Sequence, residues 1–522
     1  MTLARMALAR RIDRLLEPHR GERPGVTIGV VQEGALVLQR SAGLASLEMG
    51  VAIGAETRFR VASVSKQFTC AAVLLLAEEG RLGVGDPVRA YLPEAYGGIT
   101  LDHLMHNMSG VRDMLTLMRL GGADLGQPVT SAALMGAICR QRGLNFEPGT
   151  RYLYSNSGFF LLGRVVEAVA GCPLAEFLER RIFTPLGMTR TAHVEHPRAA
   201  AAGLATGYVR DGTAWLRAPH GFPIGGEGGL VSCVEDLAFW DQELASGQRL
   251  GAALGRALVE QVAFPDGSIC PYARGLRIAP YHGVDTVSHG GLWPGYKTEF
   301  LRAPGLGCAV IAISNDAGAD PNALAYRVLD MLAERRPGWR AAVAGGPLEG
   351  WAGCYLDGAT GVTADADFVE GQPRLRMNGV PLMPEPRDDG WLAVTRGATI
   401  LAVRPSGDGL EMALDAGHRV QLKRVAEGGA LPVDLAGVYV SEEAAATWTF
   451  DGEGGVVVDG PVVTGVAWRA EGVAGDCLRV PMPDVLFPSW IDIRLVRDAA
   501  GRVAGLEANA GRVWAMRYVR RP

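Results

Sequence analysis

The segment from Phe59 to Gly80 (FRVASVSKQFTCAAVLLLAEEG) constrains the fold most, because it joins an apolar run to a serine and a lysine. From Cys70 to Ala77 nearly every residue is apolar, which predicts a buried helix, and Gly80 stands where a left-handed C-terminal cap would lie. Ser63 then lies at the start of that helix. A chain of 522 residues, 48% of them hydrophobic, provides the large core that such a helix needs.

Ser63 and Lys66 are three residues apart, so they share one face of the predicted helix and the lysine amine can reach the serine hydroxyl. A neutral lysine would act as the base for this serine if burial or a second cation lowers its pKa, and the apolar flank supplies burial. The plainer alternative is a serine cap followed by a solvated lysine. The whole chain has only three lysines, Lys66, Lys297 and Lys423, which makes this spacing improbable by accident.

Two later segments carry polar groups that suit such a serine. In FEPGTRYLYSNSGFF a turn leads to Tyr154 and Asn156, where a phenol can relay a proton and an amide can hold a substrate carbonyl. In VSHGGLWPGYKTEF a β-like run leads to His289, Gly290 and Gly291, where glycines allow a strand edge to approach a ligand. Taken singly, Tyr154 is more often a core aromatic, Asn156 a helix cap, and His289 a residue without a role.

The composition excludes several other classes of function. The net charge of -5 is spread without acidic or basic blocks, so we expect no nucleic acid and no membrane as a partner. Eight scattered cysteines without CxxC spacing fit reduced thiols, and His103 and His106 lack a third ligand at a fitting distance, so we expect no metal and no cofactor. The first eighteen residues are interrupted by arginines and no apolar run is long enough to span a membrane, which predicts a cytoplasmic protein.

The character of the chain changes after the amphipathic run PNALAYRVLDMLAERR. From about Pro347 short alternating runs separated by Gly, Asp and Pro predict antiparallel β structure. A second copy follows, because WAGCY at 351–355 matches LAGVY at 435–439 with an offset of 84. Near the end of each copy, RVQLKRV from Arg419 matches RVWAMRYV from Arg512 with an offset of 93, so the second copy is predicted to be 9 residues longer.

These changes predict three domains. They are a catalytic domain at 1–335 and two small antiparallel β-barrel domains at 346–426 and 432–522.

Together, SVSK at 63–66, YSN at 154–156 and HGG at 289–291 resemble the serine β-lactamase, or penicillin-recognising, superfamily in order and spacing, with the class C branch most similar. The stretches LDHLMHNMSGV and HGGLWPGY also look like that branch. The resemblance covers about residues 20 to 335. It implies a multidomain α+β protein, in which a β-lactamase-like catalytic domain of helices on an antiparallel sheet precedes the two barrels.

The same resemblance implies roles for the site residues. Ser63 would be the acylated nucleophile, with Lys66 and Tyr154 as its base pair and Asn156 as a substrate contact. The oxyanion hole would be formed by the backbone N–H groups of Ser63 and Leu292.

This chain departs from the class C pattern at one motif. Class C enzymes have Lys-Thr-Gly where this chain has His289, Gly290 and Gly291, so the carboxylate anchor is missing while His289 and Gly291 stay in the site. That departure weakens the case for β-lactamase activity. It is typical of the D-aminopeptidase branch, which this chain also resembles in length.

The resulting prediction is a serine hydrolase that releases N-terminal D-residues, D-alanine foremost, from short peptides and amides through an acyl-enzyme. Its stereochemistry and an assembly as a homodimer rest on the resemblance alone. The alternatives are an esterase or amidase, or a DD-peptidase or β-lactamase, of the same fold. A further alternative is a non-catalytic penicillin-type binding or sensor protein, which the intact set of Ser63, Lys66 and Tyr154 disfavours.

The stretch GDCLRVPMPDVLFPSW at 475–490 contains three prolines, which predict a poor strand and a stiff projecting loop. The resemblance implies that a loop of the last barrel enters the catalytic cleft. Asp484, a carboxylate among apolar neighbours, would then pair with the free ammonium group of the substrate. The alternative is an inter-domain contact in which Asp484 is a solvated turn residue.

Overall fold

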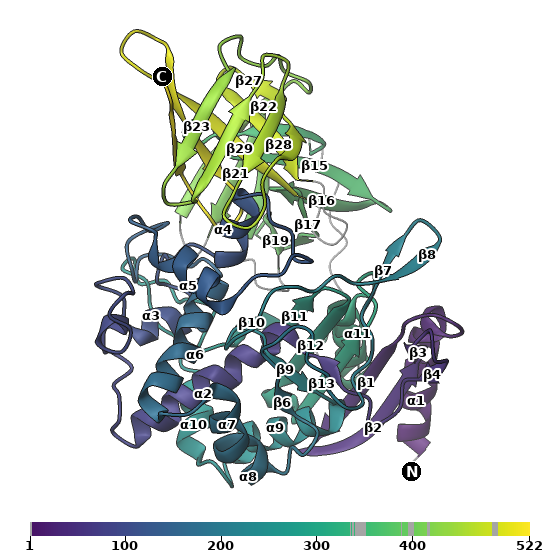
Figure 1. Cartoon of the computed structure of the whole chain (residues 1–522). Coiled ribbons are helices and arrows are strands. Elements are labelled where there is room, and N and C mark those ends of the chain that lie inside the picture. Colours follow the sequence, from purple (N-terminus) through teal and green to yellow (C-terminus); the bar gives the residue numbers. More distant parts are fainter. Residues whose placement is uncertain are drawn as a thin grey trace. The chain divides into compact units, whose positions relative to one another are not determined.

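The computed structural model describes residues 3–334, 336, 339, 351–387, 389–394, 401–414, 418–482 and 489–522 (Figure 1). Within these residues the chain divides into two compact units, which are described separately: the first consists of residues 1–109, 158–263 and 269–340, and the second of residues 110–157, 264–268 and 341–522. The segment 110–157, which the sequence predicts in the first domain, therefore groups with the C-terminal strands.

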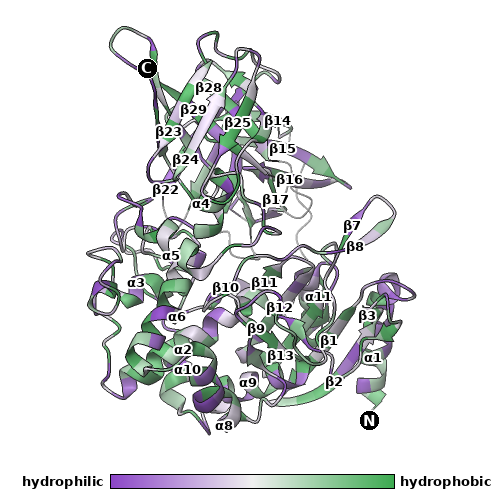
Figure 2. Ribbon diagram, in the orientation of Figure 1, coloured by the Kyte–Doolittle hydropathy of each residue, from purple (hydrophilic) through white to green (hydrophobic). Residues whose placement is uncertain are grey.

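An antiparallel sheet forms the centre of the first unit. Its six strands, as far as the chain is described, run in the order β10-β11-β12-β13-β1-β2. The strands are β1 (Val26–Gln32), β2 (Ala35–Ala42), β10 (Arg277–Tyr281), β11 (Val284–Trp293), β12 (Tyr296–Ala303) and β13 (Cys308–Ser314). The central strands β1 and β13 are buried almost throughout and are mostly hydrophobic in Figure 2, because both faces of the sheet are covered.

Helices cover the two faces of this sheet. Helices α1 (Leu3–Leu15) and α11 (Pro321–Ala333) share a core with its strands, in which Ile12, Ile28, Val310 and Val328 are buried. On the other face the first residue of α9 (Val234–Ser246) lies against β1 at Gly29. The predicted mixed architecture of helices on an antiparallel sheet is confirmed.

The remaining elements of the first unit are shorter or lie around this sheet. The helices are α2 (Ser65–Glu78), α3 (Leu101–Met105), α6 (Asn156–Ala170, in this unit from Gly158), α7 (Leu174–Leu178), α8 (Thr184–Leu186) and α10 (Ala252–Leu258). The short strands are β3 (Leu44–Ser46), β4 (Val51–Ala52), β5 (Phe59–Arg60), β6 (Ala192–His193), β7 (Tyr208–Asp211), β8 (Ala214–Arg217) and β9 (Leu230–Ser232). Among the described helices none alone is long and apolar enough to cross a membrane; only the pair 156–170 and 174–186, bent by 78°, meets that test together.

The second unit contains α4 (Met114–Leu120), α5 (Ser131–Cys139) and two antiparallel sheets of nine described strands each. The first sheet comprises β14 (Gly353–Leu356), β15 (Thr363–Val369), β16 (Gln372–Met377), β17 (Val380–Leu382), β18 (Glu385–Pro386), β19 (Leu392–Val394), β20 (Leu401–Ser406), β21 (Gly409–Leu414) and β22 (His418–Val425). The second comprises β23 (Gly437–Ser441), β24 (Ala446–Phe450), β25 (Gly455–Asp459), β26 (Val466–Arg469), β27 (Glu471–Ala474), β28 (Cys477–Met482), β29 (Ser489–Arg497), β30 (Val503–Asn509) and β31 (Met516–Arg520).

The two sheets are copies of one topology. Their strand orders are β17-β16-β15-β14-β22-β21-β20-β19-β18 and β26-β25-β24-β23-β31-β30-β29-β28-β27, which correspond strand by strand. Each encloses its own apolar core, around Trp351 and Tyr355 in the first and around Trp448 and Tyr439 in the second. The two predicted β-barrels and their repeat relation are therefore present.

The strand register corrects the predicted length difference between the copies. Tyr355 pairs with Arg424 in the first barrel and Tyr439 pairs with Arg520 in the second, which gives offsets of 84 and 96. The second copy is thus 12 residues longer at this point rather than 9. The sequence match from Arg512 was misleading because that residue lies in the connection before β31 and not in the strand itself.

The equivalent tyrosines make the same contact in both barrels. The hydroxyl of Tyr355 donates to the carbonyl of Trp351 at 2.9 Å, and that of Tyr439 donates to the carbonyl of Leu435 at 2.8 Å. In each copy the paired arginine lies over the tyrosine ring, at 5.3 Å and 5.9 Å. These bonds join the segment before the first strand of each barrel to its core.

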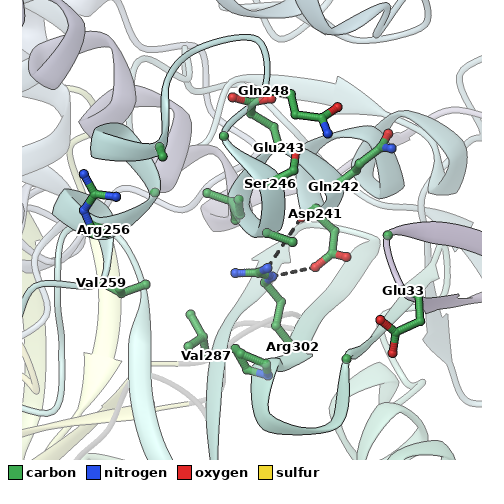
Figure 3. A pocket seen from close by; sticks show the side chains of 18 of the residues that line it. Glu33, Asp241, Gln242, Glu243, Ser246, Gln248, Arg256, Val259, Val287 and Arg302 are labelled. Atoms are coloured by element: carbon green, nitrogen blue, oxygen red, sulfur yellow. Dashed lines mark hydrogen bonds and ion pairs between the residues drawn. The ribbon is translucent and has the colours of Figure 1, made fainter.

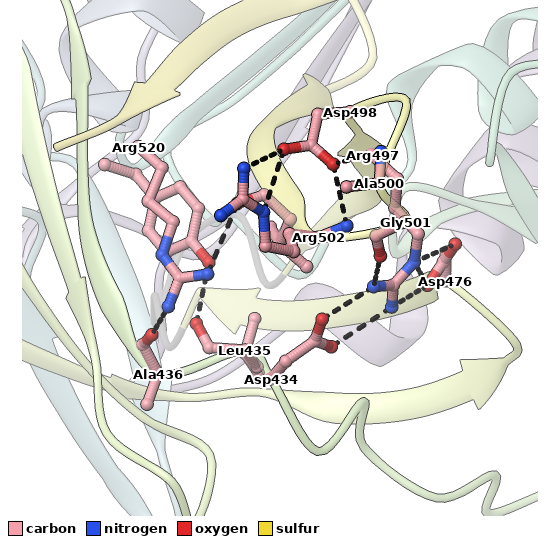
Figure 4. Close-up of polar contacts among 12 residues, drawn as sticks. Asp434, Leu435, Ala436, Asp476, Arg497, Asp498, Ala500, Gly501, Arg502 and Arg520 are labelled. Atoms are coloured by element: carbon pink, nitrogen blue, oxygen red, sulfur yellow. Dashed lines mark hydrogen bonds and ion pairs between the residues drawn. The ribbon is translucent and has the colours of Figure 1, made fainter. Parts of the chain in front are cut away.

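Helix α4 belongs to the second unit because it completes the core of the second barrel. Leu117 and Leu120 are buried among the barrel residues, and the indole N–H of Trp448 donates to the carbonyl of Leu120 at 2.9 Å. At the surface of the same barrel, Arg497 donates to Asp434 and Asp476, which joins two connections (Figure 4). Exposed ion pairs of this kind contribute little to stability, so the apolar core dominates.

The stretch 475–490 differs from its prediction at both ends. Residues 477–482 form β28, and Ser489 and Trp490 begin β29, so most of the described stretch is strand. Pro481 is tolerated because β28 pairs with β27 only as far as Arg479, which leaves no ladder bond for a missing N–H on that side. Residues 483–488, Asp484 included, lie outside the described residues.

Replacing Tyr439 by phenylalanine should destabilise the second barrel. The change leaves the carbonyl of Leu435 without its buried donor, and such a loss costs about 1 to 3 kcal/mol. Calorimetry of the full chain should show a lower transition temperature for this barrel. Tyr355→Phe should act in the same way on the first barrel, and a Tyr439→Phe protein with an unchanged transition would contradict the role given to this bond.

Candidate active site

Ser63 and Lys66 are brought together as predicted. Ser63 lies in a short 3-10 turn (Ala62–Val64) that leads directly into α2, and the Nζ atom of Lys66 donates to its Oγ atom at 3.0 Å. Between Phe59 and Val73, Ser63 is the one residue that is not buried. The fold therefore hides the lysine and presents the serine hydroxyl, which is the arrangement that a nucleophile and its base need. The predicted cap also exists, since Gly80 has a φ of 68°.

The backbone just before Ser63 is in an uncommon conformation. Ala62 has a φ of 48°, in the left-handed region that non-glycine residues adopt at a cost of about 1 to 3 kcal/mol. Its carbonyl accepts from the hydroxyl of Ser65 at 2.6 Å, and the N–H of Leu230 in β9 donates to the same hydroxyl at 3.0 Å. These bonds hold the turn, so the surrounding structure maintains the strain that directs Ser63 outwards.

Lys66 is fully buried, and its amine contacts specific groups. Besides Ser63, its Nζ atom donates to the backbone carbonyl of Glu227 at 2.7 Å and lies 5.2 Å from the ring centre of Phe159. Burial disfavours a charged amine, and the two acceptors fix its position. The lysine is therefore part of the core and not a solvated side chain.

The strand β11 approaches the serine turn closely at Gly291. A Cβ atom at this position would lie 2.2 Å from the backbone oxygen of Val61, a distance that no side chain allows. Glycine is thus required here by the close approach of two backbones. Leu292, the next residue, has a side chain that is 48% exposed, so the predicted oxyanion donor lies on a strand next to the serine turn and at the surface of this unit.

His289 is buried in β11, and both of its ring nitrogens are in use. Its Nδ1 atom lies 2.7 Å from the carbonyl of Gly290, which can only accept, so Nδ1 carries the proton. The Nε2 atom then accepts from the hydroxyl of Tyr272 at 2.9 Å. Burial, followed by the charge of Lys66, lowers the pKa of His289 to about 3, so the imidazole is neutral at ordinary pH.

Tyr154 and Asn156 lie in the second unit, where they belong to one buried polar cluster. The backbone N–H and the side-chain amide of Asn156 both donate to Asp113, at 2.8 Å and 2.9 Å. The guanidinium of Arg512 lies over the ring of Tyr154 at 4.6 Å and 3.9 Å from the same Asp113 carboxylate. Asp113 is fully buried and also caps α4, so it fixes both the amide and the arginine.

The residues of the predicted site belong to both units. Ser63, Lys66, His289, Gly291 and Leu292 belong to the first unit, and Tyr154 and Asn156 to the second. Asp484 lies outside the described residues.

Sequence reasoning missed three participants: Tyr272, Asp113 and Glu227. The first two carry no motif that could have revealed them. Glu227 lies in the glycine-rich GGEGGL, where a single acid among glycines is a signal that could have revealed it.

Other features of the first unit do not compete for this role. A pocket of about 660 Å³ lies beside α9 and includes Glu33, Asp241 and Arg302 in its lining, but neither Ser63 nor Lys66 (Figure 3). Its buried Arg302 and Asp241 already neutralise each other. Within the described residues no cluster of three or more His, Cys, Asp or Glu could hold a metal ion.

Comparisons with known proteins identify the family of this chain. Residues 8–333 match the Beta-lactamase family. The chain is similar to a D-aminopeptidase of Brucella anthropi, with 28% identity over 512 residues that cover 96% of each chain. It is also similar to a D-aminopeptidase of Cereibacter sphaeroides, with 30% identity over 469 residues that cover 87% of this chain and 86% of that one.

Among solved structures, the D-amino acid amidase from Ochrobactrum anthropi SV3 complexed with D-phenylalanine shares the fold, with a TM-score of 0.54 and 22% identity, covering 64% of this chain and 98% of that chain. The chain therefore belongs to the Beta-lactamase family of penicillin-recognising serine hydrolases. Within that family it belongs to the D-aminopeptidase branch.

Replacing Gly291 by alanine should disable the site. The added Cβ must push β11 away from the turn that carries Ser63, and a displacement of this size costs roughly 100-fold in rate. The measurement is hydrolysis of a chromogenic aminoacyl amide, with circular dichroism to check folding. Gly290→Ala is the matched control, because its Cβ would meet the end of the Glu299 side chain at 3.1 Å and the nearest backbone atom only at 3.7 Å. Equal activity of the two variants would show that the close approach is not needed.

Proposed function

We propose that this protein is a serine hydrolase that releases N-terminal D-amino acids, D-alanine foremost, from short peptides and amides. The observation that carries the proposal is the buried Lys66 amine 3.0 Å from the half-buried Ser63 hydroxyl, in a chain whose relatives are D-aminopeptidases. No second function is favoured by a specific observation.

The reaction proceeds through an acyl-enzyme. Lys66 accepts the proton of the Ser63 hydroxyl as Oγ attacks the substrate carbonyl, and the backbone N–H groups of Ser63 and Leu292 stabilise the oxyanion. Tyr154 relays the proton to the leaving amine. The guanidinium of Arg512 over its ring supports this role, because a cation stabilises negative charge on the phenolic oxygen.

Substrate recognition follows from the groups around the nucleophile. Asn156 is oriented by Asp113, which supports its role in holding the substrate amide. His289 is neutral and both of its nitrogens are engaged, so it gives no fixed cation to a substrate carboxylate. Asp484 pairs with the substrate ammonium; this assignment is supported by the sequence alone.

Location and assembly complete the proposal. We place the enzyme in the cytoplasm, because all eight cysteines lie in the described part of the chain and are free thiols, which suits a reducing compartment. The proposed assembly is a homodimer, on the resemblance to the family.

Ser63→Ala and Lys66→Ala should each reduce turnover of D-alanyl p-nitroanilide by roughly a thousandfold or more, because one removes the nucleophile and the other its base. Burst kinetics should show an acyl-enzyme in the unaltered protein and none in either variant. The L-alanyl anilide and N-acetyl-D-alanyl anilide serve as controls and should be poor substrates. A Ser63→Ala enzyme within tenfold of the unaltered protein would refute the proposed function.

His289→Lys should shift selectivity towards substrates with a free carboxylate, such as penicillins, relative to D-alanyl anilide. A charge-assisted bond contributes about 1.5 to 3 kcal/mol, which corresponds to roughly tenfold or more in the ratio of kcat/KM values. His289→Gln adds no charge and should leave the ratio unchanged. If the lysine variant also leaves it unchanged, position 289 does not face the substrate carboxylate.

A further inference from the structure

Glu227 is a buried acidic residue whose backbone carbonyl contacts the proposed base. It lies in the glycine-rich segment before β9, and only 5% of the residue is exposed. Its Oε1 atom accepts from the N–H of Gly225 at 2.9 Å. Its Oε2 atom is buried and has no hydrogen-bond partner among the described residues, which is rare for a carboxyl group and calls for a functional explanation.

The same residue binds Lys66 through its backbone. The Nζ atom of Lys66 donates to the carbonyl oxygen of Glu227 at 2.7 Å while it donates to Ser63 at 3.0 Å. The segment is also tied to α2 by Thr69, whose hydroxyl donates to the carbonyl of Gly226 at 2.6 Å. The lysine amine is thus held between the nucleophile and the residue that carries the buried carboxyl group.

The charges around Glu227 are few. The groups that face it are Lys66 from α2, Arg164 from α6 with its partners Glu167 and Glu195, and His193 from β6, which bonds to the carbonyl of Gly225 at 3.1 Å. Burial lowers the pKa of His193, so this imidazole is neutral, and Arg164 is already paired at 2.8 Å and 2.5 Å. Of these groups, Lys66 is therefore the cation whose protonation depends most on the charge of Glu227.

Burial raises the pKa of the Glu227 carboxyl group towards neutral pH, and the charges of Lys66 and Arg164 oppose this. The protonation state of Glu227 can therefore change when that of Lys66 changes. A permanent carboxylate would keep Lys66 as an ammonium ion that cannot act as a base. A permanently neutral group would leave a newly formed ammonium ion without a counter-charge in a dry site.

We propose that Glu227 is a positioning residue that stabilises the ammonium ion formed when Lys66 accepts the Ser63 proton. The inference rests on the proposed function. In the acylation step the O–H bond of Ser63 breaks, its proton binds Nζ, Oγ bonds to the carbonyl carbon, and the π electrons move to the carbonyl oxygen. When the oxyanion electrons re-form the C=O bond, the C–N bond breaks and the proton passes from Lys66 through Tyr154 to the leaving amine. Glu227 forms no bond to the substrate and acts only through Lys66.

Glu227→Gln is the direct test, because the amide keeps the acceptor for Gly225 and the shape of the side chain but removes the charge. The plateau of kcat/KM should fall about 10-fold to 100-fold, as for the loss of one electrostatic stabiliser. The acidic limb of the pH profile should also move to lower pH by about one unit or more, because Lys66 loses its counter-charge and gives up its proton more readily. A structural defect would lower the plateau without moving the limb.

The titration of Lys66 can be observed without any substrate. The chain has three lysines, so selective 13C labelling of the lysine side chains gives three NMR signals, of which Lys66→Arg removes one and assigns it. In Glu227→Gln the Lys66 signal should titrate about one pH unit or more lower than in the unaltered protein. Lys297 and Lys423 act as internal controls. The NMR titration of Lys66 needs no substrate, so it tests the role of Glu227 even if the proposed function is wrong. The turnover of Ser63→Ala tests the proposed function separately.

Asp236→Asn is the matched control variant. Asp236 is also a fully buried carboxyl group with one unpartnered oxygen among the described residues, and burial raises its pKa, but it binds Thr191 instead of Lys66. The Asp236→Asn variant should leave the titration of Lys66 unchanged. If Glu227→Gln also leaves the titration of Lys66 unchanged, the proposal is overturned. If the glutamine variant does not fold, Glu227→Asp replaces it as the test, because the shorter side chain moves the carboxylate. In Glu227→Asp the Lys66 signal should titrate at lower pH than in the unaltered protein, by less than in Glu227→Gln. The absence of any shift overturns the proposal.

Discussion

The buried amine of Lys66 is the feature on which the rest of the first unit depends. The amine donates to the Ser63 hydroxyl and to the carbonyl of Glu227, which lies 161 residues from Lys66 in the chain. Keeping the amine dry requires an apolar helix around it, which explains why α2 is buried through its first nine residues. Keeping it aligned requires a turn and a glycine-rich segment that cannot move, which explains the bonds made by Ser65 and Thr69.

Backbone proximity, more than side-chain packing, shapes the open side of this site. Gly291 lets β11 approach the serine turn. Gly226 lets its segment approach α6 and α2, where a Cβ would lie 2.6 Å from the backbone oxygen of Phe159 and 3.0 Å from the side chain of Thr69. At both places a side chain would separate the elements that have to meet. The polar bond between His289 and Tyr272 then fixes β11 from the other side. The position of β11 is thus fixed by a close backbone approach at Gly291 and by a side-chain hydrogen bond at His289.

The sequence predicted correctly those features that depend on residues close together in the chain or on a repeated pattern. The helix after Ser63, the spacing to Lys66 and the repeat of the barrels were all confirmed, because each depends on residues within one element or on a repeated pattern. Glu227 and Asp113 were missed because their roles arise from contacts between distant segments. The barrel offset failed for a related reason: a short Arg-Val match at Arg512 fell in a connection, and only strand register could show this.

The distribution of cations gives an independent argument for the role of Lys66. Of the 51 basic residues only three are lysines, and ion pairs of buried cations in the described residues, such as Arg274 with Asp102 and Arg302 with Asp241, use arginine. Arginine keeps its proton in any protein environment, so it suits permanent pairs such as that of Arg302 with Asp241. Lysine can lose its proton when it is buried. The buried cation beside Ser63 is therefore a lysine, the one of the two residue types that can give up its proton and act as the base in the proposed reaction.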